Sequence, residues 1–268
     1  MSHFFIGVIT IALVSTANAA QPTKLSSQHA IVIRDDTGSV LLEKSADVAV
    51  PIASLTKLMT AMVVLDSHPD MQQTISIKNE DVDELKHSMS HIPIGTTLTR
   101  SEMLHVALMA SDNRAAASLA RTYPGGVTAF ISAVDKKIHA LGMHNTVIRE
   151  PTGLSPENKS TAADLAKMAV EASKYPEIER NTTARTDSIR MNGHPYTLHN
   201  TNRLVGAPGW NVLLSKTGFT NEAGHCLIMR ILQSGVRATL VLLNAGGNSS
   251  RTIDAQTIRR ILGRTAVR

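Results

Sequence analysis

The sequence predicts an α/β (α+β) fold, in which an antiparallel five-stranded sheet is flanked by helices and adjoins a helical lobe. Strand-like runs occur near both ends of the chain, at residues 30–43 and 211–243, whereas residues 54–174 mostly show apolar residues at helical spacing. Helices placed between such runs are typical of a sheet that both termini complete. Neither an internal repeat nor a long linker interrupts the pattern. We therefore expect one structural unit over residues 20–268.

The first predicted elements are a hairpin and a series of helices. Residues 30–33 (AIVI) and 39–42 (SVLL) are extended runs, and residues 35–38 (DDTG) form a turn sequence between them. A helix is predicted over residues 54–66 because Leu55, Leu58, Met59, Met62 and Leu65 recur at helical spacing. Another helix starts near Thr99 and Arg100. Further helical patterns cover residues 113–120, 127–141 and 162–174.

The last third of the chain returns to extended patterns. Residues 187–196 read as a hairpin with Asn192-Gly193 as its two-residue turn. Three strand-like runs follow at residues 211–216, 225–232 and 236–243, and with the first hairpin they supply five strands. Residues 251–262 form an amphipathic basic helix that closes the chain.

The N-terminus has the pattern of an export signal. Residues 4–14 are apolar but too few to span a bilayer, and Ala17-x-Ala19 is the small-residue pattern that precedes signal cleavage. The first residues, Met1-Ser2-His3, lack the usual Lys or Arg. We predict a signal peptide at residues 1–19, a periplasmic mature protein, and no transmembrane anchor after cleavage.

Composition and charge exclude several classes of function. The formal net charge is +5, from 27 basic and 22 acidic residues, and no Lys/Arg block is present, which argues against a nucleic-acid site. Cys226 is the only cysteine, so neither an intrachain disulfide nor a thiolate metal cluster can form. His87 and His91 would share one face of a helix, but the acidic partner of a zinc-peptidase helix is missing. We expect no metal and no cofactor.

Three short elements carry side chains that could perform catalysis. In chain order they are Ser54-Leu55-Thr56-Lys57, Ser111-Asp112-Asn113 and Lys216-Thr217-Gly218. A serine hydroxyl needs an adjacent base, and Lys57 lies one helical turn after Ser54, with the two Cβ atoms about 5–6 Å apart. Lysine becomes a base when burial or a neighbouring cation such as Lys216 lowers its pKa. The N–H groups of Ser54 and Phe219 are candidates for an oxyanion hole.

The other two elements offer groups that could hold a substrate. Ser111 could relay a proton to a leaving amine, and the Asn113 amide could bind a peptide carbonyl. Lys216 and Thr217 could bind a carboxylate, while Gly218 would keep the strand edge bare for a substrate backbone. Each element alone is weak, since Ser-Asp-Asn is usually a cap or turn. Their joint occurrence at a helix start, a loop and a strand end favours one shared site.

These elements and their surroundings resemble the D-alanyl-D-alanine peptidases, which include the low-molecular-mass penicillin-binding proteins. The resemblance extends from about Ala30 to the end of the chain. It is carried by PIASLTKLMTAM (51–62), LMASDNRAA (108–116), EPTGLSPEN (150–158), STAADLA (160–166), HNTN (199–202) and SKTGFTNEAGHC (215–226). The last stretch is most similar to the endopeptidase branch of the family.

The resemblance implies a β-lactamase/transpeptidase-like fold and a serine enzyme that is acylated by a D-Ala carbonyl and then hydrolysed by water. By matching position, Ser54 is the nucleophile and Lys57 its base. The supporting residues are Ser111, Asn113, Lys216 and Thr217. The family also uses an arginine on its last helix to bind a carboxylate, and Arg251 lies closest in position. The implied partners are peptidoglycan peptides as substrates and β-lactams as covalent inhibitors.

Glu150 is similar in position to the glutamate with which class A β-lactamases activate water, but the sequence after it follows the peptidase pattern, so we do not expect it to be catalytic.

The choice of substrate rests on the length of the chain. Fifty residues follow Gly218, enough only for the remaining strands and closing helix, whereas membrane-bound carboxypeptidases continue into an extra domain and an amphipathic anchor. We therefore predict an endopeptidase that hydrolyses D-Ala–diaminopimelate cross-links. The alternatives are a carboxypeptidase that releases terminal D-Ala, a β-lactamase, and a non-catalytic penicillin sensor or wall-binding module. A sensor would need a transmembrane relay, and a binding module would not need Ser54 and Lys57.

Overall fold

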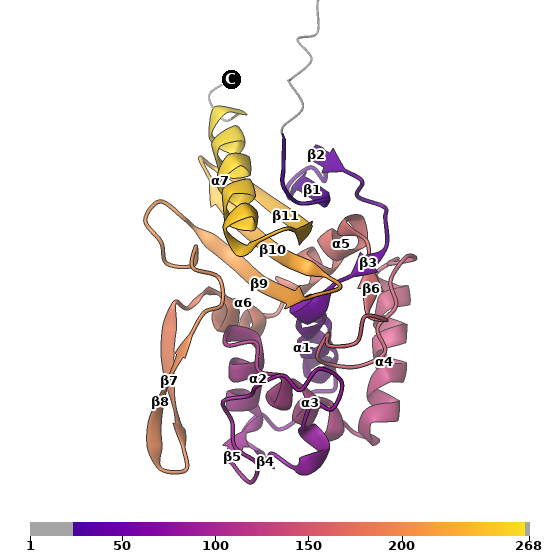
Figure 1. The fold of residues 1–268 in the computed structure, drawn as a ribbon, viewed down its shortest axis with the longest axis vertical. Coiled ribbons are helices and arrows are strands. Elements are labelled where there is room, and N and C mark those ends of the chain that lie inside the picture. The colour runs from indigo at the N-terminus through magenta and orange to yellow at the C-terminus, as the bar shows by residue number, and fades with distance from the viewer. Residues whose placement is uncertain (1–23, 266–268) are drawn as a thin grey trace, which may run out of the picture.

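A five-stranded antiparallel sheet is the largest element of the protein (Figure 1). The structure, a computed structural model, describes residues 24–265, so the predicted signal peptide lies outside it. The strand order is β2-β1-β11-β10-β9. The strands are β1 His29–Arg34, β2 Val40–Lys44, β9 Val212–Thr220, β10 Gly224–Gln233 and β11 Val236–Ala245. Because β1 pairs with β11, strands from both ends of the chain complete one sheet, and the predicted fold class is confirmed.

Helices cover both faces of this sheet. Helix α7 Asn248–Thr265 lies on one face, and α5 Ala162–Ala172 lies on the other, next to the helical lobe (Figure 1). The side chains of β11 alternate accordingly. Leu240 and Leu242 join the core under α7, whereas Val241 and Leu243 join the core shared with the lobe. This two-residue period is what a strand buried on both faces requires.

The helical lobe is built around one central helix. Its helices are α1 Thr56–Asp66, α2 Arg100–Met109, α3 Asn113–Arg121, α4 Gly126–Ala140 and α6 Pro176–Thr183. Every residue from Thr56 to Val64 is buried, which identifies α1 as the centre of the lobe. The predicted helices are present, whereas α6 was not predicted. Within residues 24–265, no helix combines the length and the apolar character needed to cross a membrane.

Short elements connect the sheet and the lobe. They are β3 Val50–Pro51 with β6 Lys159–Ser160, β4 Thr74–Ser76 with β5 Thr97–Thr99, and the single-turn helices η1 Ala53–Leu55 and η2 Asn79–Asp81. The hairpin of β7 Thr186–Met191 and β8 His194–His199 projects along the side of the lobe (Figure 1). Its turn residues Asn192 and Gly193 have φ values of 50° and 82°, which confirms the predicted two-residue turn with left-handed residues.

Candidate active site

The three sequence elements meet where the edge strand β9 packs against the start of α1. Ser54 lies in η1, whereas we had predicted that the α-helix itself begins there. The helix starts two residues later, at Thr56, after a left-handed residue, Ala53, with φ of 48°. Lys57 nevertheless lies one turn after Ser54, as predicted.

The second and third elements come from a loop and a strand. Ser111 lies in the short loop between α2 and α3 and is also left-handed, with φ of 62°. The third element lies within β9 rather than at its predicted end near Lys216. Pairing with β10 continues as far as Thr220 opposite Gly224, so Lys216, Thr217 and Gly218 are all part of the ladder.

Lys57 is the centre of the hydrogen-bond network. Its Nζ donates to Ser54 Oγ at 2.9 Å, to Asn113 Oδ1 at 2.7 Å and to the carbonyl oxygen of Thr152 at 2.7 Å. Burial lowers the pKa of Lys57 to about 8, although the carboxylates of Glu150 and Asp112 act in the opposite direction. Of the two causes that we had considered, burial and the neighbouring Lys216, burial is the one that lowers the pKa of Lys57. At this pKa roughly a tenth of the amine is neutral at pH 7, and a neutral amine is what a general base requires.

Lys216 forms a second buried amine beside the first. Its Nζ donates to Ser111 Oγ at 2.9 Å and to the carbonyl oxygen of Thr217 at 3.0 Å, and neither acceptor carries a charge. Burial first, and then the positive charges of Lys57 and Arg251, lower the pKa of Lys216 well below its usual value. A bound anion would reverse this effect, because an opposite charge stabilises the ammonium form. The position therefore suits a substrate carboxylate.

Asn113 has partners on both ends of its amide. Its Oδ1 accepts from Lys57, and its Nδ2 donates to Ser88 Oγ at 2.8 Å. Ser88 belongs to the segment of residues 82–96, which connects η2 to β5. An ion pair between Lys86 and Glu222 joins this segment to the β9–β10 turn. A peptide carbonyl at Asn113 would have to compete with Ser88. No sequence pattern pointed to Ser88, because its position depends on an irregular segment.

Two glycines hold the backbone around Ser54. A Cβ added at Gly218 would lie 3.0 Å from the N atom of Ser54 and 3.0 Å from Ala53 Cβ. At Gly153, whose φ is 88°, an added Cβ would lie 1.9 Å from the carbonyl oxygen of Ala53. Gly218 therefore allows β9 to approach the turn around Ser54 closely, and its role in keeping the strand edge bare for substrate stays a prediction. Gly153 is a further residue of the site that sequence reasoning missed.

Glu150 organises the loop that brings Gly153 and Thr152 to the site. Its carboxylate accepts from the backbone N–H groups of Thr152 at 2.7 Å, Gly153 at 2.6 Å and Ser155 at 3.3 Å, and from Asn158 Nδ2 at 2.9 Å. These hydrogen bonds give the Glu150 carboxylate a structural role, which accounts for its position without a role in catalysis. The loop positions the Thr152 carbonyl that accepts from Lys57.

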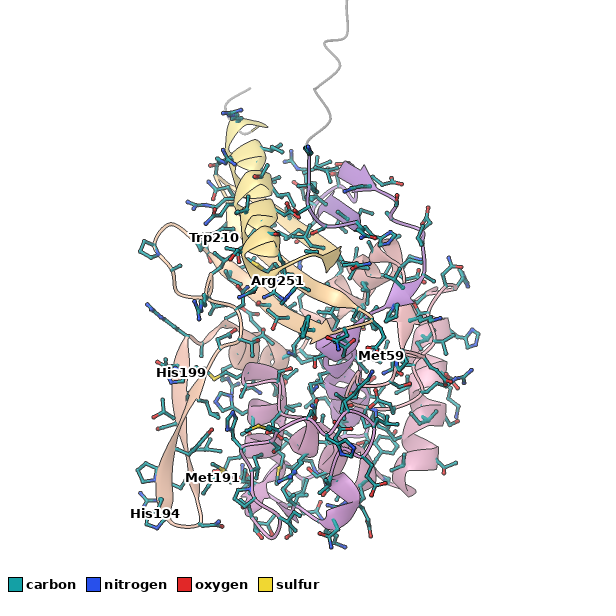
Figure 2. All side chains as sticks on the ribbon, in the orientation of Figure 1. Met59, Met191, His194, His199, Trp210 and Arg251 are labelled. Atoms are coloured by element: carbon teal, nitrogen blue, oxygen red, sulfur yellow. The ribbon has the colours of Figure 1, made fainter. Side chains whose placement is uncertain are left out.

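The remaining predicted residues lie around the two lysines. Thr217 Oγ1 is 2.6 Å from the Oγ1 atom of Thr201, which lies two residues after β8. Phe219 is 56% exposed and stacks on His225, with the ring centroids 4.4 Å apart. Arg251 lies near the start of α7 (Figure 2), where its Nη1 donates to the carbonyl oxygen of Cys226 at 2.8 Å. Its charge contributes to the lowered pKa of Lys216, which links it to the site.

The two histidines considered for a metal site do not lie on a helix. Residues 82–96 contain no helix, so His87 and His91 are not presented on one helical face. Among the described residues, no group of three or more His, Cys, Asp and Glu side chains is placed to hold a metal ion. A cavity of about 430 Å³ borders Asn113 and Thr152, but Ser54, Lys57 and Lys216 are not among the residues that line it.

Comparison with known proteins identifies the family of this chain. The sequence model of the family described as D-alanyl-D-alanine carboxypeptidase matches residues 16–247. The chain belongs to the D-alanyl-D-alanine carboxypeptidase family. As a member of this family it is a serine-type D-Ala-D-Ala peptidase, which confirms the predicted enzyme class.

Relatives within the D-alanyl-D-alanine carboxypeptidase family include proteins with other names. The chain is 43% identical to a D-alanyl-D-alanine endopeptidase of Pseudomonas aeruginosa, over 98% of this chain and 89% of that protein. It is 41% identical to a D-alanyl-D-alanine endopeptidase of Escherichia coli, over 93% of this chain and 81% of that protein. Among solved structures, the Streptomyces K15 DD-transpeptidase matches with a TM-score of 0.83 and 26% identity, over 90% of this chain and 98% of the other.

Proposed function

We propose that this protein is a periplasmic endopeptidase that hydrolyses D-Ala–diaminopimelate cross-links of peptidoglycan through an acyl-enzyme on Ser54. The observation that carries the proposal is the contact between Ser54 Oγ and the buried amine of Lys57, whose pKa is lowered to about 8. A hydroxyl beside a partly neutral amine can act as a nucleophile at neutral pH.

The acylation step follows from the positions of these groups. Ser54 Oγ attacks the D-Ala carbonyl carbon, and its proton passes to Lys57 Nζ. The oxygen of the tetrahedral intermediate accepts from the N–H groups of Ser54 and Phe219. The C–N bond then breaks, and the leaving nitrogen receives through Ser111 the proton that Lys57 took up, which leaves Lys57 neutral again. A water molecule later attacks the ester carbon and gives a proton to Lys57. The ester C–O bond then breaks, and Lys57 returns this proton to Ser54 Oγ.

Substrate binding uses the other buried amine. Lys216, with Thr217 beside it and Arg251 near the start of α7, supplies positive charge and a hydroxyl for a carboxylate of the peptide. The bound carboxylate stabilises the ammonium form of Lys216, whose pKa is lowered in its absence. Asn113 Nδ2 donates to a peptide carbonyl of the substrate once its hydrogen bond to Ser88 Oγ is broken. β-Lactams bind in the same way and acylate Ser54, and a Listeria monocytogenes penicillin-binding protein with a TM-score of 0.79 has been solved with cefotaxime bound.

The endopeptidase specificity is supported by the names of the relatives with 43% and 41% identity. A carboxypeptidase is the second candidate, because several relatives, at 32% and 24% identity among others, carry that name. Chromatography of products from intact sacculi distinguishes the two. Loss of cross-linked dimers with gain of monomers is the result expected of an endopeptidase. Release of free D-alanine from untouched dimers would make the protein a carboxypeptidase instead.

The assignment of Ser54 is tested with fluorescent penicillin, followed by digestion to locate the adduct. Wild-type protein should carry the label on the peptide that contains Ser54. The Ser54→Ala variant should lose both labelling and peptidase activity while keeping the unfolding midpoint of the wild type. Full labelling of that variant would refute the assignment.

A further inference from the structure

A groove of about 640 Å³ lies beside α7, apart from the catalytic residues. Its walls are α7, the end of β10 and the residues that lead from Thr201 to β9. Trp210, the only tryptophan of the chain, is half-buried in this groove and lies next to α7 (Figure 2). None of the residues that line it takes part in the proposed catalytic steps.

One arginine is held in a fixed orientation in the groove. The guanidinium carbon of Arg259 is 5.1 Å from the centroid of the Trp210 ring, and Arg259 Nε donates to Gln233 Oε1 at 3.0 Å. The chain leaves room for the guanidinium at Gly209, where an added Cβ would lie 2.6 Å from Arg259 Nη2. Within residues 24–265, neither Nη1 nor Nη2 of Arg259 has a hydrogen-bond or ion-pair partner. A fixed fork with two unused nitrogen atoms matches the two oxygens of a carboxylate.

The charge around this fork favours an anionic ligand. Arg260 is exposed beside it, and among the described residues its side chain forms one hydrogen bond, from Nη2 to Thr257 Oγ1 at 2.9 Å. From residue 223 to the end of the sequence, Asp254 is the only acidic residue. That carboxylate is buried and accepts from the backbone and hydroxyl of Ser27. The groove thus presents two guanidinium groups and no acid among its lining residues.

We propose that this groove binds a carboxylate-bearing stretch of peptidoglycan that lies outside the cross-link being cut. The proposal rests on the proposed function, which brings this polymer to the protein. Arg259 binds a peptide carboxylate through Nη1 and Nη2, Arg260 adds charge, and the Trp210 ring offers apolar surface for the attached sugar or peptide.

The position of the groove fits one polymer bound at both places. Thr201 contacts Thr217 in the candidate active site, and Trp210 follows nine residues later. Nine residues span at most about 30 Å. A strand of the wall held in the groove therefore stays within reach of Ser54 between successive cuts, which raises the effective concentration of neighbouring cross-links.

Binding is measured by cosedimentation with purified sacculi, in the Ser54→Ala background so that the polymer stays intact. Arg259→Gln should weaken binding about tenfold, because it removes a charged pair of hydrogen bonds. Arg259→Lys should recover little of this loss, since an ammonium cannot form the bidentate pair. Arg260→Gln is the second groove variant. Arg180→Gln, which removes the same charge from an exposed position on α6, is the matched control and should bind within about twofold of the parent.

Activity is measured separately on a small soluble cross-linked dimer with Ser54 intact. Arg259→Gln should cleave this dimer at the wild-type rate, because the dimer is too short to need the groove. If wild-type protein leaves the dimer uncut, the proposed function fails whatever the binding result. If Arg259→Gln and Arg260→Gln bind sacculi as well as Arg180→Gln does, the groove proposal fails alone. If the Arg259→Gln variant still binds sacculi but no longer binds anionic phospholipid vesicles that the parent binds, the groove proposal is overturned. The ligand of the groove would then be a lipid phosphate.

Discussion

The pH dependence of acylation tests the role of Lys57 as the base. Only the neutral amine can accept the Ser54 proton, so the acylation rate should rise with pH and level off above the pKa of about 8. At this pKa roughly half of the amine is neutral at pH 8, roughly a tenth at pH 7 and roughly a hundredth at pH 6. The rate should therefore fall about fiftyfold between pH 8 and pH 6.

A change of one charge should move this profile in a known direction. The Asp112 carboxylate raises the pKa of Lys57, so Asp112→Asn should shift the rising limb to lower pH. Asparagine retains the oxygen that accepts from the N–H of Ala115, so α3 keeps its cap. The matched control is Asp36→Asn, an exposed carboxylate in the β1–β2 turn that pairs with Arg34, and it should leave the profile unchanged.

Single-turnover labelling with fluorescent penicillin, quenched at successive times, gives the rate at each pH. Lys57→Ala should lower it by ~10²–10⁴ and abolish the rising limb, because the positioned proton transfer is lost. A rate that is flat between about pH 6 and about pH 8 would refute the assignment. So would a rising limb that persists in Lys57→Ala, because another group would then have to be the base.

Three further substitutions test the surroundings of the site. Gly153→Ala should lower the free energy of unfolding by at least about 2 kcal/mol in urea denaturation, because φ is 88° and the new Cβ meets the Ala53 carbonyl; unchanged stability would contradict this close approach. Lys216→Ala should slow labelling about tenfold more than Lys216→Arg, which keeps the charge; equal losses would count against an electrostatic role. Arg251→Ala should lower the free energy of unfolding by about 1–3 kcal/mol, since the buried Cys226 carbonyl loses its donor; a change confined to labelling would make Arg251 purely a binding residue.

The elements with a strong period or a specific turn sequence could be predicted from the sequence. The β-branched residues 31–33 predicted β1, and the Asn192-Gly193 pair predicted the turn of the β7–β8 hairpin. Helix α2 begins where Thr99 and Glu102 form reciprocal caps, which is a local signal. Helix α6 was missed because its eight residues are mostly polar and its buried residues, Ile178 and Thr182, are too few to reveal a period.

Within the site, residues that act through a reactive side chain could be predicted from the sequence, whereas residues that act through the backbone could not. Ser54 and Lys57 are one turn apart, so their contact follows from helical spacing. The Thr152 carbonyl reaches Lys57 Nζ only because Glu150 folds a loop 95 residues further along the chain. Any residue can offer a carbonyl, so Thr152 carries no signal of its own in the sequence. The hydrogen bond between Asn113 and Ser88 could not be predicted either, because an irregular segment determines the position of Ser88.

The strained backbone before Ser54 explains why two distant glycines belong to the site. Ala53 has φ of 48°, a left-handed conformation that costs a residue with a Cβ about 1–2 kcal/mol. Such a conformation persists only where the surrounding structure enforces it. Gly153 approaches the Ala53 carbonyl from one loop, and Gly218 approaches the N atom of Ser54 from β9. The turn therefore lies between the helical lobe and the sheet, and a shift of either would release it. This arrangement makes the position of the Ser54 hydroxyl depend on how the two halves of the fold pack together, rather than on the local sequence that first identified it.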